Sequence, residues 1–170
     1  MPPASQARPA SRFDSPQQEA FLNLWRAYDT LKALEDALFS PFDISAQQYN
    51  ALRLLRRNHP GKLHTLALAG QLVSRAPDIT RLIDRLEKRK LVARERPEEN
   101  RRVVLVGITA AGLNLLTRLD PLVRECNLQQ LGHLSPARLK TLVGLLRLAR
   151  APHEKKPPTK ARPGKKGTHD

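Results

Sequence analysis

The chain has few residues of the kinds that build disulfide frameworks, aromatic cores or membrane spans. Of its 170 residues, one is a cysteine and 4% are aromatic. A lone cysteine, Cys126, cannot form an internal disulfide, which suits a reducing cytosol. No apolar run approaches the roughly 18 residues of a membrane span, and residues 1–15 lack the apolar segment of a secretory signal. These scarcities predict a soluble cytoplasmic protein, without a membrane segment, whose core is mainly aliphatic.

Acidic residues are scarce relative to basic ones. The chain holds 30 Lys and Arg against 16 Asp and Glu, a formal net charge of +14. Residues 151–170 contribute six basic and two acidic residues, a net +4, which leaves +10 for the remainder. An excess of this size favours phosphate binding through counterion release. Double-stranded DNA is therefore the first partner predicted, and a merely soluble basic protein is the alternative.

Composition divides the chain into three parts. Residues 1–15 and 151–170 are rich in Pro, Ala, Ser, Lys and Gly, so we expect a disordered N-terminal arm and a disordered basic tail. The tail is predicted either to grip phosphates or to be a solvated extension. Residues 16–150 are predicted to form one mainly α-helical domain. Its DNA-binding core spans about residues 45–108, and its dimerisation helices span about 16–40 and 109–150.

Apolar residues at spacings of three and four predict six helices in this domain. The predicted ranges are 16–40, 46–57, 65–72, 75–90, 110–132 and 136–150. Ser15, Ser45, Thr109 and Ser135 are N-cap residues at four of the starts, and Asp120-Pro121 predicts a kink or a split in the fifth helix. The terminal helices carry more Leu than one small domain covers. They are predicted to form a dimer interface, unless they cover each other within one chain.

The third and fourth helices, Thr65–Leu72 and Arg75–Lys90, are predicted to form a helix-turn-helix. In such a unit the second helix enters the major groove of DNA and presents its N-terminal residues to base edges. The exposed residues there are Arg75, Ala76, Asp78, Thr80 and Arg81. Arg can bind two acceptors on guanine, and Thr can touch a thymine methyl group or a phosphate. An ordinary helical hairpin with a solvated basic face is the alternative.

Two strands are predicted after this helix, at 91–96 and 103–108, joined by a projecting loop. Their basic residues include Arg94, Arg96, Arg101 and Arg102. Beside a recognition helix, such a loop can reach the backbone or the minor groove, where Arg is favoured. The acids Glu95, Glu98 and Glu99 are expected to pair with neighbouring Arg residues or to orient them, and so to weaken this field. The predicted fold is thus a mainly α winged helix-turn-helix with a two-stranded β-wing.

The sequence contains no Gly-rich phosphate loop and no nucleophile–base set, and its histidines lack metal-ligand spacing. An enzyme is therefore not predicted, and neither is a cofactor or a metal. Cys126 is interpreted as structural, although Arg124 beside it could lower its pKa. Trp25 and Tyr28 are predicted to pack in the core, with an effector pocket at the dimer interface as the alternative.

The run SRAPDITRLIDRLEKRKLVARERPEENRRVVLVGITAAG, residues 74–112, resembles the signature of the MarR family of winged helix-turn-helix regulators. The matching features are Pro-x-Ile-Thr-Arg, Asp-Arg-Leu-Glu, Leu-Val, an Arg-bearing wing and Thr-x-x-Gly, and the resemblance extends over about residues 20–148. It implies a homodimer that binds a pseudo-palindromic operator sequence-specifically. Such regulators are usually repressors, relieved by a small aromatic or anionic effector or by thiol oxidation. The alternative is a nonspecific basic nucleic-acid-binding or packaging protein.

The resemblance also assigns roles by position. It places Pro77, Asp78, Thr80 and Arg81 at the recognition-helix contacts, and Arg102 at the wing arginine that enters the minor groove. The complete predicted DNA-binding set is Arg75, Pro77, Asp78, Thr80, Arg81, Arg94, Arg101 and Arg102. Asn100 stands where the family often has Asp, and Lys90 where it favours Gly. A left-handed Lys90 would cost about 1 kcal/mol more than Gly, unless the turn has another geometry.

Overall fold

The computed structural model describes residues 13–73, 78–100 and 102–154. They fall into two compact units, one ending at Gln130 and the other beginning at Leu131. The elements, in chain order, are α1 (Pro16–Phe39), η1 (Ser40–Phe42), α2 (Ala46–Asn58), β1 (Leu63–His64), α3 (Thr65–Gln71), α4 (Ile79–Lys88), β2 (Val92–Glu95), β3 (Leu105–Ile108), α5 (Ala110–Leu131), α6 (Pro136–Arg150) and η2 (Ala151–His153).

The predicted fold class is confirmed, with one strand more than expected. The sheet is antiparallel in the order β1-β3-β2. Arg94 of β2 and Leu63 of β1 both lie opposite Val106 of β3, so β3 is central and β2 is an edge strand. Strand β1 has only two residues and therefore no alternation that a sequence pattern could reveal.

The predicted N-caps form the expected hydrogen bonds. The side chains of Ser15 and Ser135 accept bonds from the backbone N–H groups three residues later, and Ser45 forms a reciprocal capping box with Gln48. The Thr109 hydroxyl accepts a bond from Gly112 N at 3.1 Å where α5 begins. Helix α5 then continues through Pro121 to Leu131, which excludes the split and leaves the kink as the prediction at this proline.

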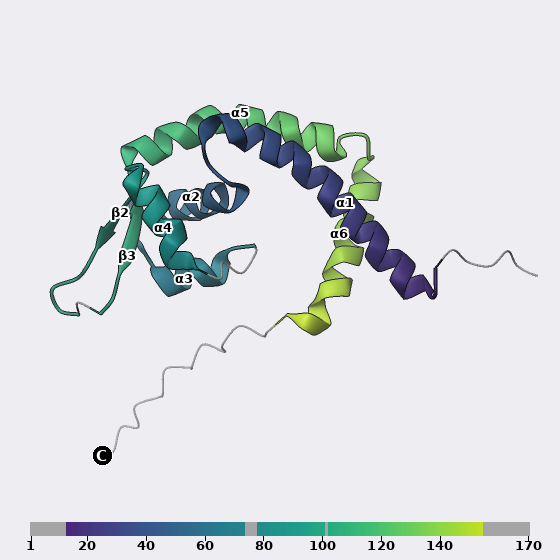
Figure 1. Ribbon diagram of the computed structural model, residues 1–170, viewed down its shortest axis with the longest axis horizontal. Helices are drawn as coiled ribbons and strands as arrows, with labels where there is room; N and C mark the ends of the chain where they lie inside the picture. The colour runs from purple at the N-terminus through teal and green to yellow at the C-terminus, as the bar shows by residue number, and fades with distance from the viewer. Residues whose placement is uncertain (1–12, 74–77, 101, 155–170) are drawn as a thin grey trace, which may run out of the picture. The chain divides into compact units, whose positions relative to one another are not determined.

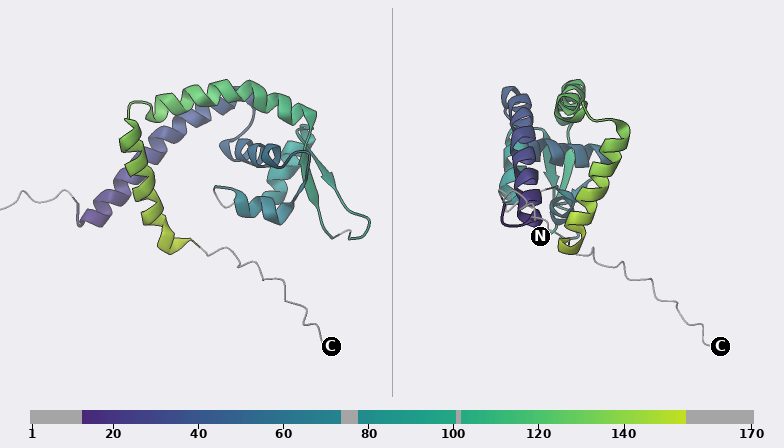
Figure 2. Two further views of the ribbon diagram at one scale, coloured as in Figure 1. Left: turned by 180° about the vertical axis from the view of Figure 1, so that it is seen from behind. Right: turned by 90° about the vertical axis from the view of Figure 1, so that its right-hand side faces the viewer.

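The core of the first unit joins the helix-turn-helix to α5. In Figures 1 and 2, α5 lies on the side of α2 and α4 that faces away from α3, and the β2–β3 hairpin projects beyond the helices. Side chains from all these elements meet in one aliphatic core, as the sequence predicts. Its largest fully buried members are Leu52, Leu55, Leu68, Ile83, Leu86, Val92, Val106, Leu116 and Leu119.

Helix α1 lies beside α5, where Gln130 Nε2 donates to the carbonyl oxygen of Leu31 at 3.0 Å. Its N-terminal half exposes Phe21, Trp25 and Tyr28, each at about 60%, so the predicted packing of Trp25 and Tyr28 in the core does not occur within this chain. The other large apolar side chains that are exposed on the terminal helices are Leu24 and Leu34 of α1, Leu122 and Leu128 of α5, and Val143, Leu145 and Leu148 of α6. No helix in the described ranges combines the length and apolarity needed to cross a membrane.

Candidate nucleic-acid interface

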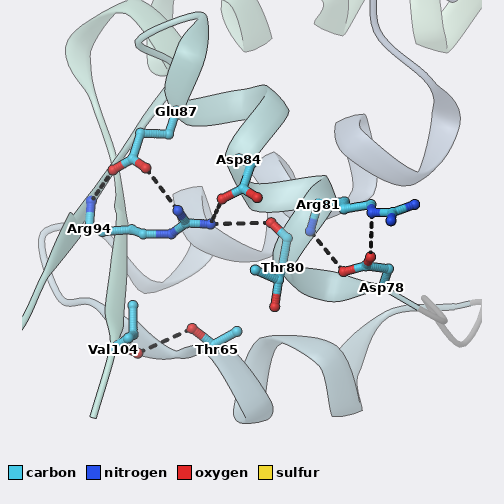
Figure 3. A network of polar contacts seen from close by, with 8 residues as sticks. All are labelled: Thr65, Asp78, Thr80, Arg81, Asp84, Glu87, Arg94 and Val104. Carbon is cyan, nitrogen blue, oxygen red and sulfur yellow. Dashed lines mark hydrogen bonds and ion pairs between the residues drawn. The ribbon is translucent and has the colours of Figure 1, made fainter. Parts of the chain in front are cut away.

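The exposed N-terminal end of α4 is organised by Asp78. Its carboxylate accepts a bond from Arg81 N at 2.9 Å and forms an ion pair with Arg81 Nε at 2.8 Å (Figure 3). Asp78 is thus the N-cap of α4, and the predicted start of this helix near Ser74 is wrong. The Arg81 side chain remains 80% exposed, and Thr80 is exposed beside it. Arg75 and Pro77 lie outside the described residues.

Helix α4 ends in a Schellman motif. Leu91 N donates to Leu86 O at 3.0 Å and Lys90 N donates to Glu87 O at 2.7 Å. Lys90 occupies the position that favours glycine, with φ of 57°. The left-handed geometry expected from the sequence is therefore present. Thr109 secures this turn, because its hydroxyl donates to Lys90 O at 2.7 Å.

Arg94 of β2 faces α4 (Figure 3). Its Nη2 lies 2.5 Å from Asp84 Oδ1 and donates to Thr80 O at 3.2 Å, while its Nη1 lies 3.0 Å from Glu87 Oε2. The backbone N–H of Arg94 also donates to Glu87 Oε1 at 3.2 Å. Only 25% of the Arg94 side chain is exposed. One side chain therefore joins the wing to the recognition helix at three residues.

The wing loop is a turn closed by Asn100. Asn100 N donates to Pro97 O, and Val103 N donates to Asn100 O. The Asn100 side chain accepts a bond from Arg102 N at 3.2 Å, so the amide that replaces the family's Asp still orients the backbone of the wing arginine. The Arg102 side chain is exposed. Arg101 lies outside the described residues.

A second set of contacts fixes the other side of the wing. Thr65 at the start of α3 donates to Val104 O through both its N–H and its hydroxyl, at 3.1 and 3.3 Å. Glu95 forms an ion pair with Lys62, so the expected pairing of Glu95 with a neighbouring Arg is wrong. The wing is thus attached to both helices of the helix-turn-helix.

These attachments create a hollow of about 320 Å³ between α3, α4 and the wing. Its lining includes His64, Thr80, Arg94, Arg96 and Arg102. Thr80 at the start of the recognition helix therefore shares one concave basic surface with the wing arginines. A surface of this kind suits a polyanionic backbone and the base edges beside it.

Sequence reasoning missed the partners that hold this surface together. In the sequence, Asp84 and Glu87 appear only as the acids of the Asp-Arg-Leu-Glu segment, and Thr65 only as the start of a helix. The spacing of Thr80, Asp84 and Glu87 could have indicated this, because residues four and three positions apart share one face of a helix. The packing of β2 against α4 decides which basic side chain faces Asp84 and Glu87, and local sequence does not specify that packing.

A bidentate ion pair links α2 to the middle of α5. Arg56 Nη1 and Nη2 donate to the two Asp120 carboxylate oxygens at 2.8 and 2.9 Å. The Arg56 guanidinium lowers the pKa of the Asp120 carboxyl below its ordinary value of 3.8. This pair fixes α2 on the long helix α5.

Cys126 is buried on α5. Burial, and to a smaller extent the nearby Glu35 carboxylate, raise the pKa of its thiol, so the lowering suggested by Arg124 does not occur. A raised pKa keeps the thiol protonated and unreactive. This agrees with the interpretation of Cys126 as a structural residue.

A further hollow, of about 410 Å³, lies among α1, α2 and the residues that follow α3. Aromatic side chains and ionisable groups line it together, among them Tyr28, Glu35, Phe39, Tyr49 and Arg53. Burial raises the pKa of the Glu35 carboxyl, and the Asp36 carboxylate raises it further. The Arg53 guanidinium lies 5.8 Å from the centre of the Tyr49 ring, within the range of a cation–π contact.

Comparisons with known proteins agree with this geometry. The MarR family model matches residues 44–104. The transcriptional regulator FarR of Neisseria gonorrhoeae is 31% identical over 104 residues, which cover 61% of this chain and 70% of FarR. A solved MarR transcription factor from Planctomyces limnophilus is 56% identical, with a TM-score of 0.65, over 81% of this chain and 99% of that one.

A third similar protein is BpsR of Bordetella bronchiseptica, whose DNA binding is regulated by 6-hydroxynicotinic acid. It is 27% identical, with a TM-score of 0.70, over 82% of this chain and 97% of that one. The likenesses thus include the helix-turn-helix, the wing and most of the flanking helices. The chain belongs to the MarR family, whose members are DNA-binding transcriptional regulators and not enzymes.

Proposed function

We propose that the protein is a homodimeric repressor that reads a pseudo-palindromic operator. In this reading Asp78, Thr80 and Arg81 lie at the major groove, while Arg102 enters the minor groove. The observation that carries the proposal is the basic hollow that Thr80 shares with Arg96 and Arg102. It allows one duplex to meet the recognition helix and the wing together. Arg75, Pro77 and Arg101 complete the proposed set from outside the described residues.

The test is the affinity for a duplex recovered by selection from random DNA, compared with a scrambled duplex at fixed salt. Arg81→Ala and Arg102→Ala should each weaken binding to the selected duplex by about tenfold or more, as expected for the loss of an arginine contact to a base or groove. Arg124→Ala is the matched control, because it removes the same charge from an exposed position on α5. Full-strength binding by both interface variants would contradict the proposed reading mode.

The alternative, a nonspecific packaging protein, makes a different prediction in the same assay. It relies on charge alone, so the selected and scrambled duplexes should bind equally well. Thr80→Ala should then have no effect, because threonine carries no charge. A preference for the selected duplex that depends on Thr80 would exclude this alternative.

The dimer is supported by the exposed apolar side chains of the terminal helices. Phe21, Trp25 and Tyr28 together present an apolar face on α1 larger than a monomer needs. Trp25 is the sole tryptophan of the chain, so its fluorescence reports on this face. We expect its emission to shift to longer wavelength as dilution dissociates the dimer. An emission spectrum independent of concentration, with a monomeric sedimentation coefficient, would contradict the proposal.

A small aromatic acid is the proposed effector, and the hollow beside α1 is its proposed site. The rings of Tyr28, Phe39 and Tyr49 suit an aromatic ligand, and the Arg53 guanidinium suits its carboxylate. The compound that regulates BpsR, 6-hydroxynicotinic acid, is a suitable probe. We expect it to weaken operator binding by the wild type and to have a smaller effect on Arg53→Met. Equal responses from the two proteins would exclude Arg53 as the ligand's partner.

A further inference from the structure

Strand β2 needs an attachment that its sheet does not supply. It is an edge strand, hydrogen-bonded to β3 on one side only. On its other side, Arg94 N donates to Glu87 Oε1 of α4 at 3.2 Å. Glu87 thereby satisfies an edge amide that would otherwise be open to water or to another chain. The recognition helix thus takes the place of a further strand at this point.

The Arg94 guanidinium reinforces the same attachment. It contacts Thr80 O, Asp84 and Glu87, and the first and last of these lie seven residues apart on α4, or about 10 Å at 1.5 Å per residue. A single side chain therefore supports the recognition helix along most of two turns. Its contact with Thr80 O also fixes the backbone of a residue proposed to touch DNA.

Charge balance opposes a phosphate contact by this side chain. Arg94 lies between two carboxylates, so the three groups together carry a net charge of −1 at neutral pH. To bind a phosphate, the guanidinium would have to leave both carboxylates unpaired in front of a polyanion. Arg81 differs, because it is 80% exposed while Arg94 is 25% exposed.

We propose that Arg94 is a positioning residue of the DNA-reading surface and does not itself contact DNA. With Asp84 and Glu87 it forms a clamp that sets the distance and angle between the recognition helix and the wing. The inference rests on the proposed function, since it concerns how the two parts of the reader are held for one duplex. It replaces the direct DNA contact that the sequence suggested for Arg94.

The first test neutralises the acids of the clamp and keeps Arg94. If Arg94 contacted DNA and its ion pairs with Asp84 and Glu87 weakened that contact, Asp84→Asn with Glu87→Gln would free the guanidinium and tighten operator binding. The clamp predicts the opposite, namely a fall of about tenfold in the ratio of operator to random-DNA affinity, as charged hydrogen bonds are lost. Glu98→Gln with Glu99→Gln is the matched control, because it removes two acids from the wing loop and should leave the ratio unchanged. A rise in the ratio for the clamp variant would overturn the inference.

The second test uses the salt dependence of operator binding. Each phosphate contact contributes about −0.9 to the slope of log affinity against log salt concentration, and two protomers double this. Arg94→Met should weaken operator binding but leave the slope within about 0.3 of the wild type. A slope that becomes shallower by about 1.8 would identify Arg94 as a phosphate contact and overturn the inference.

The third test needs no DNA and so separates the clamp from the proposed function. Hydrogen exchange of the Arg94 amide in the free protein reports directly on its bond to Glu87. Glu87→Ala, which removes the acceptor oxygen, should accelerate this exchange at least fivefold, whereas Glu98→Ala should leave it unchanged. If the wild-type protein showed no operator preference, the proposed function would fail. The exchange measurement would still show whether Glu87 holds the Arg94 amide. Unchanged exchange in Glu87→Ala would overturn the inference.

Discussion

Lys90 offers a sharp test of the backbone geometry between the recognition helix and the wing. It occupies the C′ position of the Schellman motif with φ of 57°, where a side chain costs about 1–2 kcal/mol relative to the right-handed region. Glycine avoids that cost but loses about 0.5–1 kcal/mol more backbone entropy on folding. Through the backbone alone, Lys90→Gly should therefore increase the free energy of unfolding by about 0.5–1 kcal/mol.

Lys90→Ala separates backbone geometry from charge. Alanine retains the Cβ and so the left-handed penalty, but it removes the ammonium group beside the negative end of α4, an interaction worth about 0.3–1 kcal/mol. Both substitutions remove this group, so we expect Lys90→Ala to be equal to the wild type or slightly less stable. Lys90→Gly should exceed Lys90→Ala by about 1 kcal/mol, and the wild type by less than that. The backbone carbonyl of residue 90 still accepts the Thr109 hydroxyl in all three proteins.

The assay is denaturant unfolding at one fixed protomer concentration, because dimerisation makes stability concentration-dependent. A thermal midpoint would rise by about 2–4 °C per kcal/mol for a chain of this size. Equal stability of the Gly and Ala variants would refute the reasoning, since it would mean that φ at residue 90 carries no cost. A Lys90→Gly variant that is less stable than Lys90→Ala would refute it as well.

Three further predictions concern elements that hold the reader in place. Gly112→Ala should destabilise the fold by about 2 kcal/mol, because the new Cβ would lie 2.3 Å from Leu91 O; Gly70→Ala, which meets nothing within 4 Å, should be neutral or stabilising in the same unfolding assay. Asp120→Asn should lower the free energy of unfolding by about 1 kcal/mol at pH 7. Because the folded-state pKa of Asp120 is lowered, this difference in stability should persist above about pH 3.8 and disappear as the pH falls through the folded pKa. A difference that instead grew on acidification would contradict the stabilising ion pair between Arg56 and Asp120. Ser45→Ala should cost about 1 kcal/mol through loss of the capping box, measured by the same unfolding.

The sequence was most informative where local chemistry decides the structure. Ser15, Ser45 and Ser135 have side chains that bond to helix N–H groups only three residues away, so their positions predict helix starts independently of the rest of the fold. The buried face of the recognition helix follows for a similar reason, since Leu82, Ile83 and Leu86 recur with the helical period.

Errors arose where two local signals competed or tertiary contacts decided. Ser74 and Asp78 are both capping residues, and the carboxylate of Asp78, bonded to Arg81 N and Arg81 Nε, marks the start of α4. Pro121 breaks a helix in isolation, yet α5 continues through it where Arg56 binds the preceding Asp120. In both places the outcome depends on contacts that the spacing of residues does not encode.

The candidate site divides in the same way. The resemblance of residues 74–112 to a family signature located the recognition helix and the wing, and the fold confirmed both elements. The role of Arg94 could not be predicted, because its partners lie seven to fourteen residues earlier on a different element. An arginine count alone treats Arg81 and Arg94 as equivalent, although one is exposed and the other is held by two carboxylates.

The central claim is that two copies of this chain read one operator together. Selection of bound sites from random DNA by the full-length protein tests it most directly. The account predicts an inverted repeat whose half-site centres lie about one helical turn, or about ten base pairs, apart. Recovery of sites without a shared motif, or of a single unpaired half-site, would contradict it.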